Sequence, residues 1–227
     1  MGEETPEGRP TRHDKFHLEL DALADRALEM ARLAQEALEK SITALFTRDE
    51  HLARRVIEGD REINRLELFL DEECARVVAL YQPVAADLRL VMAVDHINHE
   101  LERIGDQSVN IAEEVLELLQ APHLELDTDL PRMTRRVQDM LELALRAFKQ
   151  KDISLAQQVC EVEEEVDVLD RAITQELLQQ MVGRQEVVAV GQSLINVVRN
   201  LERVGDHATN IGEHVLYLVE GEMVHTP

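Results

Sequence analysis

Carboxylate and amide side chains recur four residues apart in two segments that lie one hundred residues apart in the chain. Their members are Glu102, Asp106, Asn110, Glu202, Asp206 and Asn210. Four residues make about one turn of an α-helix, so each trio forms one stripe along a helix. Carboxylate and amide oxygens are hard ligands, which suit Mg²⁺, Mn²⁺, Ca²⁺ or iron. Each stripe therefore predicts a cation site on the outer surface of a helical bundle.

Two further segments carry acidic stripes of the same kind. The residues expected to serve as ligands there are Asp60, Asn64, Glu163 and Asp167, followed along the same faces by Glu67, Asp71 and Asp170. If the helices lie side by side, two stripes converge on each site, and a cation relieves their repulsion. The alternative is an ordinary solvated face of an amphipathic helix. Like charges four residues apart cost a helix roughly 0.2 to 0.5 kcal/mol per pair, which favours the metal interpretation.

Other kinds of metal site have less support. Zinc is less expected because the cysteines and histidines do not cluster at ligand spacing. His207 and His214 lie near the second acidic stripe, but histidines in such positions are more often surface or capping residues than ligands. A di-iron carboxylate bundle needs inward Glu-x-x-His pairs, but the sequence has this spacing only from Glu222 to His225. The identity of the metal stays open among iron, manganese, magnesium, calcium and zinc.

Apolar residues recur every three to four positions along most of the chain, which predicts helices throughout. The predicted helices span residues 16–46, 49–81, 83–120, 131–149, 153–181 and 186–220. Asp49 and Asp152 are expected N-caps, Pro83 is expected in a first helical turn, and Gly221 is expected to end the last helix. The fold class is all-α.

An internal repeat organises these helices. Residues 101–116 match residues 201–216 at ten of sixteen positions, and residues 48–67 match residues 151–170 more weakly. The repeat predicts two tandem, antiparallel three-helix bundles. The expected boundaries are a disordered tail at 1–13, a first bundle at 14–120, a linker at 121–129, a second bundle at 130–221 and a tail at 222–227.

The charge balance restricts the partners. The 227 residues include 46 acidic and 24 basic ones, a net charge of −22, so nucleic acid and anionic lipid are disfavoured. Charges interrupt every apolar run, so direct membrane insertion is not expected. The two cysteines lack CxxC spacing, no secretory signal is recognisable, and no nucleotide loop or nucleophile motif is present. We therefore expect a cytoplasmic protein that is not an enzyme.

Four segments resemble signature segments of the PhoU family. They are RVIEGDREINRLE (55–67), QPVAADLRLVM (82–92), ELERIGDQSVNIAEE (100–114) and NLERVGDHATNIGEHVLYLVEG (200–221). The resemblance covers about residues 15–221 and implies two similar three-helix bundles. In that family the motif (E/D)-x-x-x-D marks surface sites where some members hold multinuclear metal clusters. The pairs beginning at Glu102, Glu163 and Glu202 match the motif, whereas Asp60 to Asn64 ends in an amide, which implies weaker binding or another geometry.

The resemblance also implies a function. PhoU proteins are negative regulators that link a phosphate ABC transporter to a sensor histidine kinase. The expected partners are the transporter's ATPase subunit and that kinase, at the inner membrane, with the chain itself a homodimer. Two alternatives are a metal-binding or metal-buffering protein and a helical cochaperone or scaffold. Metal stoichiometry and phosphate-dependent partner binding discriminate among the three.

Overall fold

The computed structural model describes residues 11–121 and 128–221. Six α-helices and one short 3₁₀-helix account for almost all of these residues. They are α1 (Arg12–Thr47), α2 (Glu50–Tyr81), α3 (Ala85–Gln120), α4 (Leu130–Gln150), α5 (Ile153–Met181), η1 (Gln185–Val187) and α6 (Val188–Glu220). The described part of the chain has no β-strand, so the all-α prediction is confirmed.

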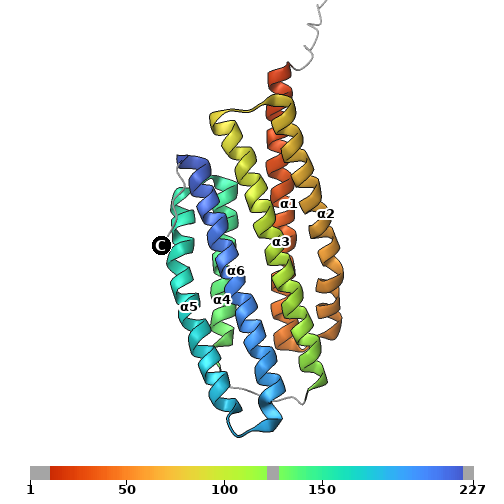
Figure 1. The fold of residues 1–227 in the computed structure, drawn as a ribbon, viewed down its shortest axis with the longest axis vertical. Coiled ribbons are helices and arrows are strands. Elements are labelled where there is room, and N and C mark those ends of the chain that lie inside the picture. Colours follow the sequence, from red (N-terminus) through yellow and green to blue (C-terminus); the bar gives the residue numbers. More distant parts are fainter. Residues whose placement is uncertain (1–10, 122–127, 222–227) are drawn as a thin grey trace, which may run out of the picture.

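The helices form two antiparallel three-helix bundles, as predicted. Helices α1, α2 and α3 pack against one another in a first unit, and α4, α5 and α6 do so in a second unit. The two units lie side by side, and α3 and α6 run in opposite directions where the units meet (Figure 1). Helix α1 also contacts α4, which adds a second line of contact between the units.

One continuous apolar core runs through both units. It consists mainly of Leu, Ile, Val, Ala and Met side chains spaced for one face of each helix, and Leu66, Ile104 and Met140 are among its largest members. Burying such side chains is the main favourable contribution to folding. The polar faces of α2, α3, α5 and α6 are thereby held in fixed positions. None of the helices in the described ranges has a stretch long and apolar enough to span a membrane.

Local capping explains most helix ends. The Asp49 carboxylate accepts a hydrogen bond from the Leu52 amide at 3.0 Å, and Asp152 accepts from the Ser154 amide at 2.8 Å. Gly221 ends α6 in the left-handed conformation (φ 81°). These three predictions are confirmed.

Two helix starts differ from the prediction. Helix α1 begins at Arg12, because Thr11 and Asp14 form a capping box, so the end of the predicted 1–13 tail is helical. Pro83 lies in the link between α2 and α3, because Gln82 caps α2 in a left-handed conformation and Val84 is the N-cap of α3. The described residues do not include 1–10, 122–127 and 222–227. The rest of that tail, most of the predicted linker and the predicted C-terminal tail fall in these ranges.

Candidate functional site

Four of the predicted ligands gather between α2 and α3. We call Asp60, Asn64, Glu102 and Asp106 the first carboxylate cluster. The Asn64 amide donates a hydrogen bond to Asp60 Oδ2 at 2.8 Å, and the charge of Asp106 acts on both Asp60 and Glu102. All four residues are half-buried, in contrast to the outer-surface position expected from the helical wheel. The two stripes therefore converge where α2 and α3 pack against each other.

The environment of this cluster disfavours negative charge. Burial raises the pKa of Asp60 and of Glu102, and the nearby charge of Asp106 raises both further. Arg103 provides partial compensation, with guanidinium nitrogens 3.5 Å from a Glu102 oxygen and 3.7 Å from an Asp106 oxygen. Its side chain is 61% exposed, so this compensation is weak. Carboxylates held together in this way are stabilised by a cation between them.

A glycine allows α2 and α3 to approach closely at the first carboxylate cluster. A Cβ atom added to Gly105 would lie 3.0 Å from Ile63 Cδ1 and 3.3 Å from Asp60 Oδ1. The cluster would therefore have to open slightly to accept any larger residue. At the corresponding Gly205 the nearest atoms would be 3.6 Å away, which is ordinary van der Waals contact.

The second unit has a similar but more exposed group between α5 and α6, in which the two glutamates are half-buried and the two aspartates are exposed. We call Glu163, Asp167, Glu202 and Asp206 the second carboxylate cluster. Burial raises the pKa of Glu163, Glu202 and Asp206, and Asp206 raises that of both glutamates further. The charge of Asp167 contributes to all three shifts. The eight predicted residues thus form two groups of four, one in each unit.

The ligand types and the unsatisfied oxygens fit a hard divalent cation. Asp60 Oδ1 and Asn64 Oδ1 are shielded from solvent, and neither accepts a hydrogen bond from any described residue. Buried acceptors without a donor are costly, and a cation would satisfy them. The residues that would hold such an ion are Asp60, Asn64, Glu102 and Asp106 in the first unit, and Glu163, Asp167, Glu202 and Asp206 in the second. Among the described residues, no three carboxylates of either cluster bring ligand oxygens within 4.8 Å of one another, so the side chains would have to move closer together around the ion. When bound, the ion would supply charge neutralisation.

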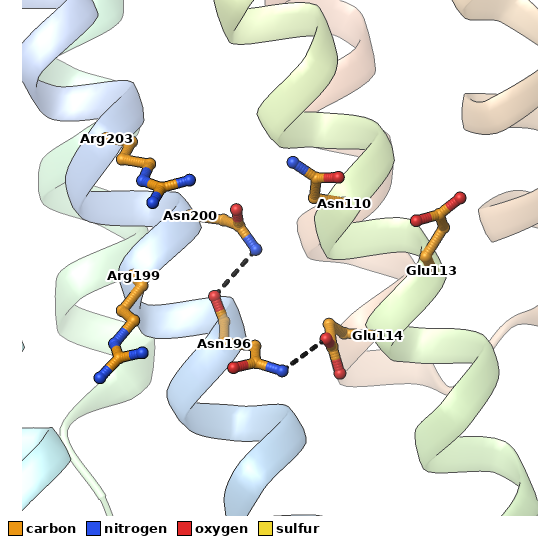
Figure 2. Close-up of a pocket in the computed structure, with 7 residues that line it drawn as sticks. All are labelled: Asn110, Glu113, Glu114, Asn196, Arg199, Asn200 and Arg203. Atoms are coloured by element: carbon orange, nitrogen blue, oxygen red, sulfur yellow. Dashed lines mark hydrogen bonds between the residues drawn. The ribbon is translucent and has the colours of Figure 1, made fainter.

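The two remaining predicted ligands lie elsewhere, at the contact between α3 and α6. The Asn210 amide donates to Glu100 Oε2 at 3.2 Å. Asn110 lines a polar pocket of about 240 Å³ between the same two helices, where the Glu114 carboxylate accepts a hydrogen bond from the Asn196 amide at 2.7 Å (Figure 2). Asn110 and Asn210 therefore face the other unit, away from the carboxylate clusters.

Comparison with known proteins identifies the family to which this chain belongs. The family model described as the PhoU domain matches the chain twice, at residues 27–115 and 130–215. The chain belongs to the PhoU family. Both PhoU domain matches include carboxylate-cluster residues, so each PhoU domain carries one cluster.

Full-length relatives and solved structures agree with this membership. The phosphate-specific transport system accessory protein PhoU of Escherichia coli (strain K12) is 34% identical over 208 residues, covering 92% of this chain and 86% of the relative. The PhoU homolog of Aquifex aeolicus (strain VF5) is 37% identical over 210 residues, covering 92% and 95%. The crystal structure of PhoU from Pseudomonas aeruginosa superposes with a TM-score of 0.88 at 34% identity, covering 91% of this chain and all of that one.

The contact between the two PhoU domains contains ionisable residues whose partners sequence reasoning missed, and it includes His207 and His214, which are half-buried there instead of lying at the surface or at a helix end as expected. Glu100 Oε2 lies 2.7 Å from His207 Nδ1, and the rings of His96 and His214 stack with centroids 4.8 Å apart. The repeat holds the one signal in the sequence that could have pointed to this contact. Glu100 corresponds to Asn200, so the first unit has a charged side chain where the second unit has an amide. Periodicity places His207 and His214 on a partly polar face, but only the packing of α6 on α3 gives them partners.

The environment of Cys74 does not favour nucleophilic chemistry. Cys74 is buried, and burial raises the pKa of its thiol to about 12, so the thiolate is scarce at neutral pH. Cys74 therefore acts as a small core residue. Cys160 is partly buried.

Proposed function

We propose that this chain is an accessory protein of a phosphate ABC transporter and restrains the phosphate-starvation response when phosphate is plentiful. The proposal rests on its similarity, over 92% of its length, to phosphate-specific transport system accessory proteins. In this role it is an adaptor: one surface contacts the transporter's ATPase subunit and another contacts the cytoplasmic part of a sensor histidine kinase.

The charge of the chain supports recruitment by protein contacts. With a net charge of −22, the surface repels anionic lipid headgroups. A cytoplasmic adaptor of this kind reaches the inner membrane through the subunits it binds.

The two carboxylate clusters give the adaptor its metal dependence in this proposal. Each cluster holds a hard divalent cation, which neutralises carboxylates that burial and mutual repulsion otherwise destabilise. Cation binding also links α2 to α3 and α5 to α6. The bound state is therefore the more rigid one for partner recognition.

A reporter experiment tests the regulatory role. Host cells that lack their own copy of the gene carry a reporter under a phosphate-starvation promoter and receive this chain. We expect the parent chain to repress the reporter in high phosphate. The double variant Asp106→Asn/Asp206→Asn should lose most repression, whereas Glu117→Gln, which changes an exposed carboxylate of α3, should repress like the parent. A reporter that stays derepressed with the parent chain would contradict the proposal.

Metal buffering is the second candidate, and the presence of two similar clusters favours it. It predicts that the purified chain binds metal at both clusters but that the reporter does not respond to the chain. The same experiment, combined with metal analysis of the purified protein, separates the two functions.

A further inference from the structure

A polar pocket lies at one end of the contact between α3 and α6. It has a volume of about 240 Å³ and combines two arginines and two asparagines of α6 with two glutamates and one asparagine of α3. Figure 2 shows the side chains of Arg203, Asn200 and Asn110 directed into the space between the two helices. The pocket therefore joins the two units and is separate from both carboxylate clusters.

The other end of the same contact contains an anion of its own. Glu100 Oε2 accepts a hydrogen bond from the Asn210 amide at 3.2 Å and lies 2.7 Å from His207 Nδ1. Burial raises the pKa of Glu100, but its contacts with His207 and Asn210 bring that pKa below the ordinary value, so the carboxylate is ionised at neutral pH. The contact between α3 and α6 thus accommodates a negative charge at this end.

The pocket lies at the repeat-equivalent place, where this anion is missing. Glu100 corresponds to Asn200, and Asn210 corresponds to Asn110. The Asn200 amide donates to a backbone carbonyl of its own helix at 2.8 Å, so it does not replace the carboxylate. The Asn110 amide has only a long hydrogen bond of 3.5 Å to Gln107 Oε1. A donor that meets a carboxylate at the first end is therefore available to a ligand at the second.

Two arginines give the pocket positive charge. Arg103, which corresponds to Arg203, has guanidinium nitrogens 3.5 Å from a Glu102 oxygen and 3.7 Å from an Asp106 oxygen. In contrast, neither Arg203 nor Arg199 has a side-chain nitrogen within 4.0 Å of a carboxylate oxygen of any described residue. A guanidinium is a planar cation with five N–H donors, a geometry that suits oxyanions.

The two glutamates restrict the kind of anion. Glu113 is exposed, so solvent screens its charge. Glu114 is half-buried, and its Oε1 accepts a hydrogen bond from the Asn196 amide at 2.7 Å. Sulfate has no proton to donate, so Glu114 would repel it. Inorganic phosphate keeps at least one proton at neutral pH, so it can donate to this carboxylate while it accepts from Arg203.

We propose that this pocket binds hydrogen phosphate between the two units. Arg203 and Arg199 neutralise its charge, and the Asn110 amide donates to it. Glu114 accepts a hydrogen bond from its protonated oxygen. A phosphate monoester has a second pKa of about 6, so at pH 7 it keeps little of the proton that this contact requires and should bind more weakly. The proposal concerns binding alone and does not depend on the regulatory role.

The competing explanation is that the two arginines only balance acidic residues of the second unit, since the charge of Arg199 acts on Asp170. Calorimetric titration of inorganic phosphate into the purified full chain at pH 7 separates the two explanations. Chelator treatment beforehand removes divalent ions, to which phosphate would otherwise bind. Sulfate and AMP are titrated in the same chloride buffer at the same ionic strength.

We expect phosphate to bind at least about tenfold more tightly than sulfate, because only phosphate forms the charged hydrogen bond with Glu114. Phosphate should also bind more tightly than AMP. Equal affinity for phosphate and sulfate, or tighter binding of AMP, would overturn the proposal.

Four variants locate the binding, with helicity checked by circular dichroism. Arg203→Gln should weaken phosphate binding by at least about tenfold. Arg103→Gln, which makes the same change in charge at the repeat-equivalent position, should bind phosphate like the parent. Glu114→Gln should narrow the preference for phosphate over sulfate. Asn200→Glu should prevent phosphate binding, because it introduces the carboxylate that Glu100 provides at the other end.

The amide resonances of the Asn110 side chain, followed by NMR, report on the pocket itself. They should shift as phosphate is added to the parent chain and to Arg103→Gln. Equal affinity in Arg203→Gln and Arg103→Gln, or Asn110 resonances that do not move with phosphate, would overturn the proposal and leave the arginines as balancing charges.

Discussion

At the scale of single residues, an ionic contact outside the clusters links α1 to α2. The Arg76 guanidinium contacts Glu19 Oε2 at 2.5 Å, and the Tyr81 hydroxyl donates to Glu19 Oε1 at 3.0 Å. The hydrogen bond from Arg76 is the main reason why the pKa of Glu19 is below its ordinary value of 4.5. Because the folded pKa is lowered, this contact stabilises the fold at neutral pH. That contribution is lost as the pH falls below 4.5 through the folded pKa.

We therefore expect Glu19→Gln to lower the free energy of unfolding at pH 7 by about 0.5 to 1 kcal/mol, a value appropriate to a partly exposed pair. The variant and the parent should converge at a pH below the folded pKa of Glu19. Urea unfolding at several pH values measures this, with Glu39→Gln, an exposed carboxylate of α1, as the control. A difference that persists undiminished at low pH would contradict the ionic explanation.

The second carboxylate cluster gives another prediction for single residues. In chelator-stripped protein, Asp206→Asn should raise the free energy of unfolding by roughly 0.2 to 0.5 kcal/mol for each like-charge pair that it relieves. With Mn²⁺ the order should reverse, because an ion at a hundred times its dissociation constant stabilises the fold by about 2.7 kcal/mol. Thermal unfolding with and without Mn²⁺ measures both effects. Asp139→Asn, on the exposed face of α4, should show neither effect.

The residues of the two carboxylate clusters could be named from the sequence, but their burial and their contacts with neighbouring residues could not. The four-residue spacing of Glu102 and Asp106 places them on one stripe whatever the tertiary fold, which is why they could be found. Asn110 continues that stripe, but it lies about two turns beyond Glu102, and the net rotation of about 80° over those turns directs it toward α6. Glu67 and Asp71 were expected on the acidic face of α2, but their approach to His99 was not predicted, because it depends on the axial position of α3 relative to α2.

At the scale of helices, the repeat offers a matched pair of glycines. Gly105 lies against Ile63, a fully buried residue that has little room to move, whereas Gly205 has space for a methyl group. Alanine favours a helix over glycine by about 1 kcal/mol. Gly205→Ala should therefore raise the free energy of unfolding by about 0.5 to 1 kcal/mol.

Gly105→Ala should be less stable than Gly205→Ala by about 1 kcal/mol or more, because the added methyl group separates α2 from α3. It should also weaken cation binding at the first carboxylate cluster. Urea unfolding and Mn²⁺ titration of both variants check this. Equal gains in stability from the two substitutions would show that the close approach of α2 and α3 is not restrictive.

Most helices could be predicted from sequence to within a few residues. Apolar periodicity and the caps at Asp49 and Asp152 are local signals, so they survive in the folded protein. The errors arose where two signals compete. Pro83 suits a first helical turn. However, Gln82 ends α2 in a left-handed conformation and donates its backbone N–H to the Val78 carbonyl, so Pro83 lies in the link between the helices.

At the scale of the whole molecule, the two units are joined unequally along α3 and α6. At one end Glu100 accepts one hydrogen bond from Asn210 and contacts His207. At the equivalent end, Asn200 instead donates to the Asn196 carbonyl at 2.8 Å, beside the polar pocket. The ionisable end should contribute more to the coupling of the units.

Glu100→Ala should therefore lower the free energy of unfolding by about 1 to 3 kcal/mol, since it leaves His207 and Asn210 without their acceptor. Asn200→Ala at the equivalent position should cost about 1 kcal/mol or less. Guanidinium unfolding of both variants compares the two ends. A larger loss from Asn200→Ala would contradict this ranking.

Partner binding is the central claim at this scale, because the adaptor role depends on it. The most direct test is calorimetric titration of the chain onto the purified ATPase subunit of its host's phosphate transporter, with Mn²⁺ and after chelation. We predict saturable binding that Mn²⁺ strengthens in the parent and that Asp106→Asn/Asp206→Asn weakens. The absence of binding by the parent chain in either condition would contradict the adaptor account.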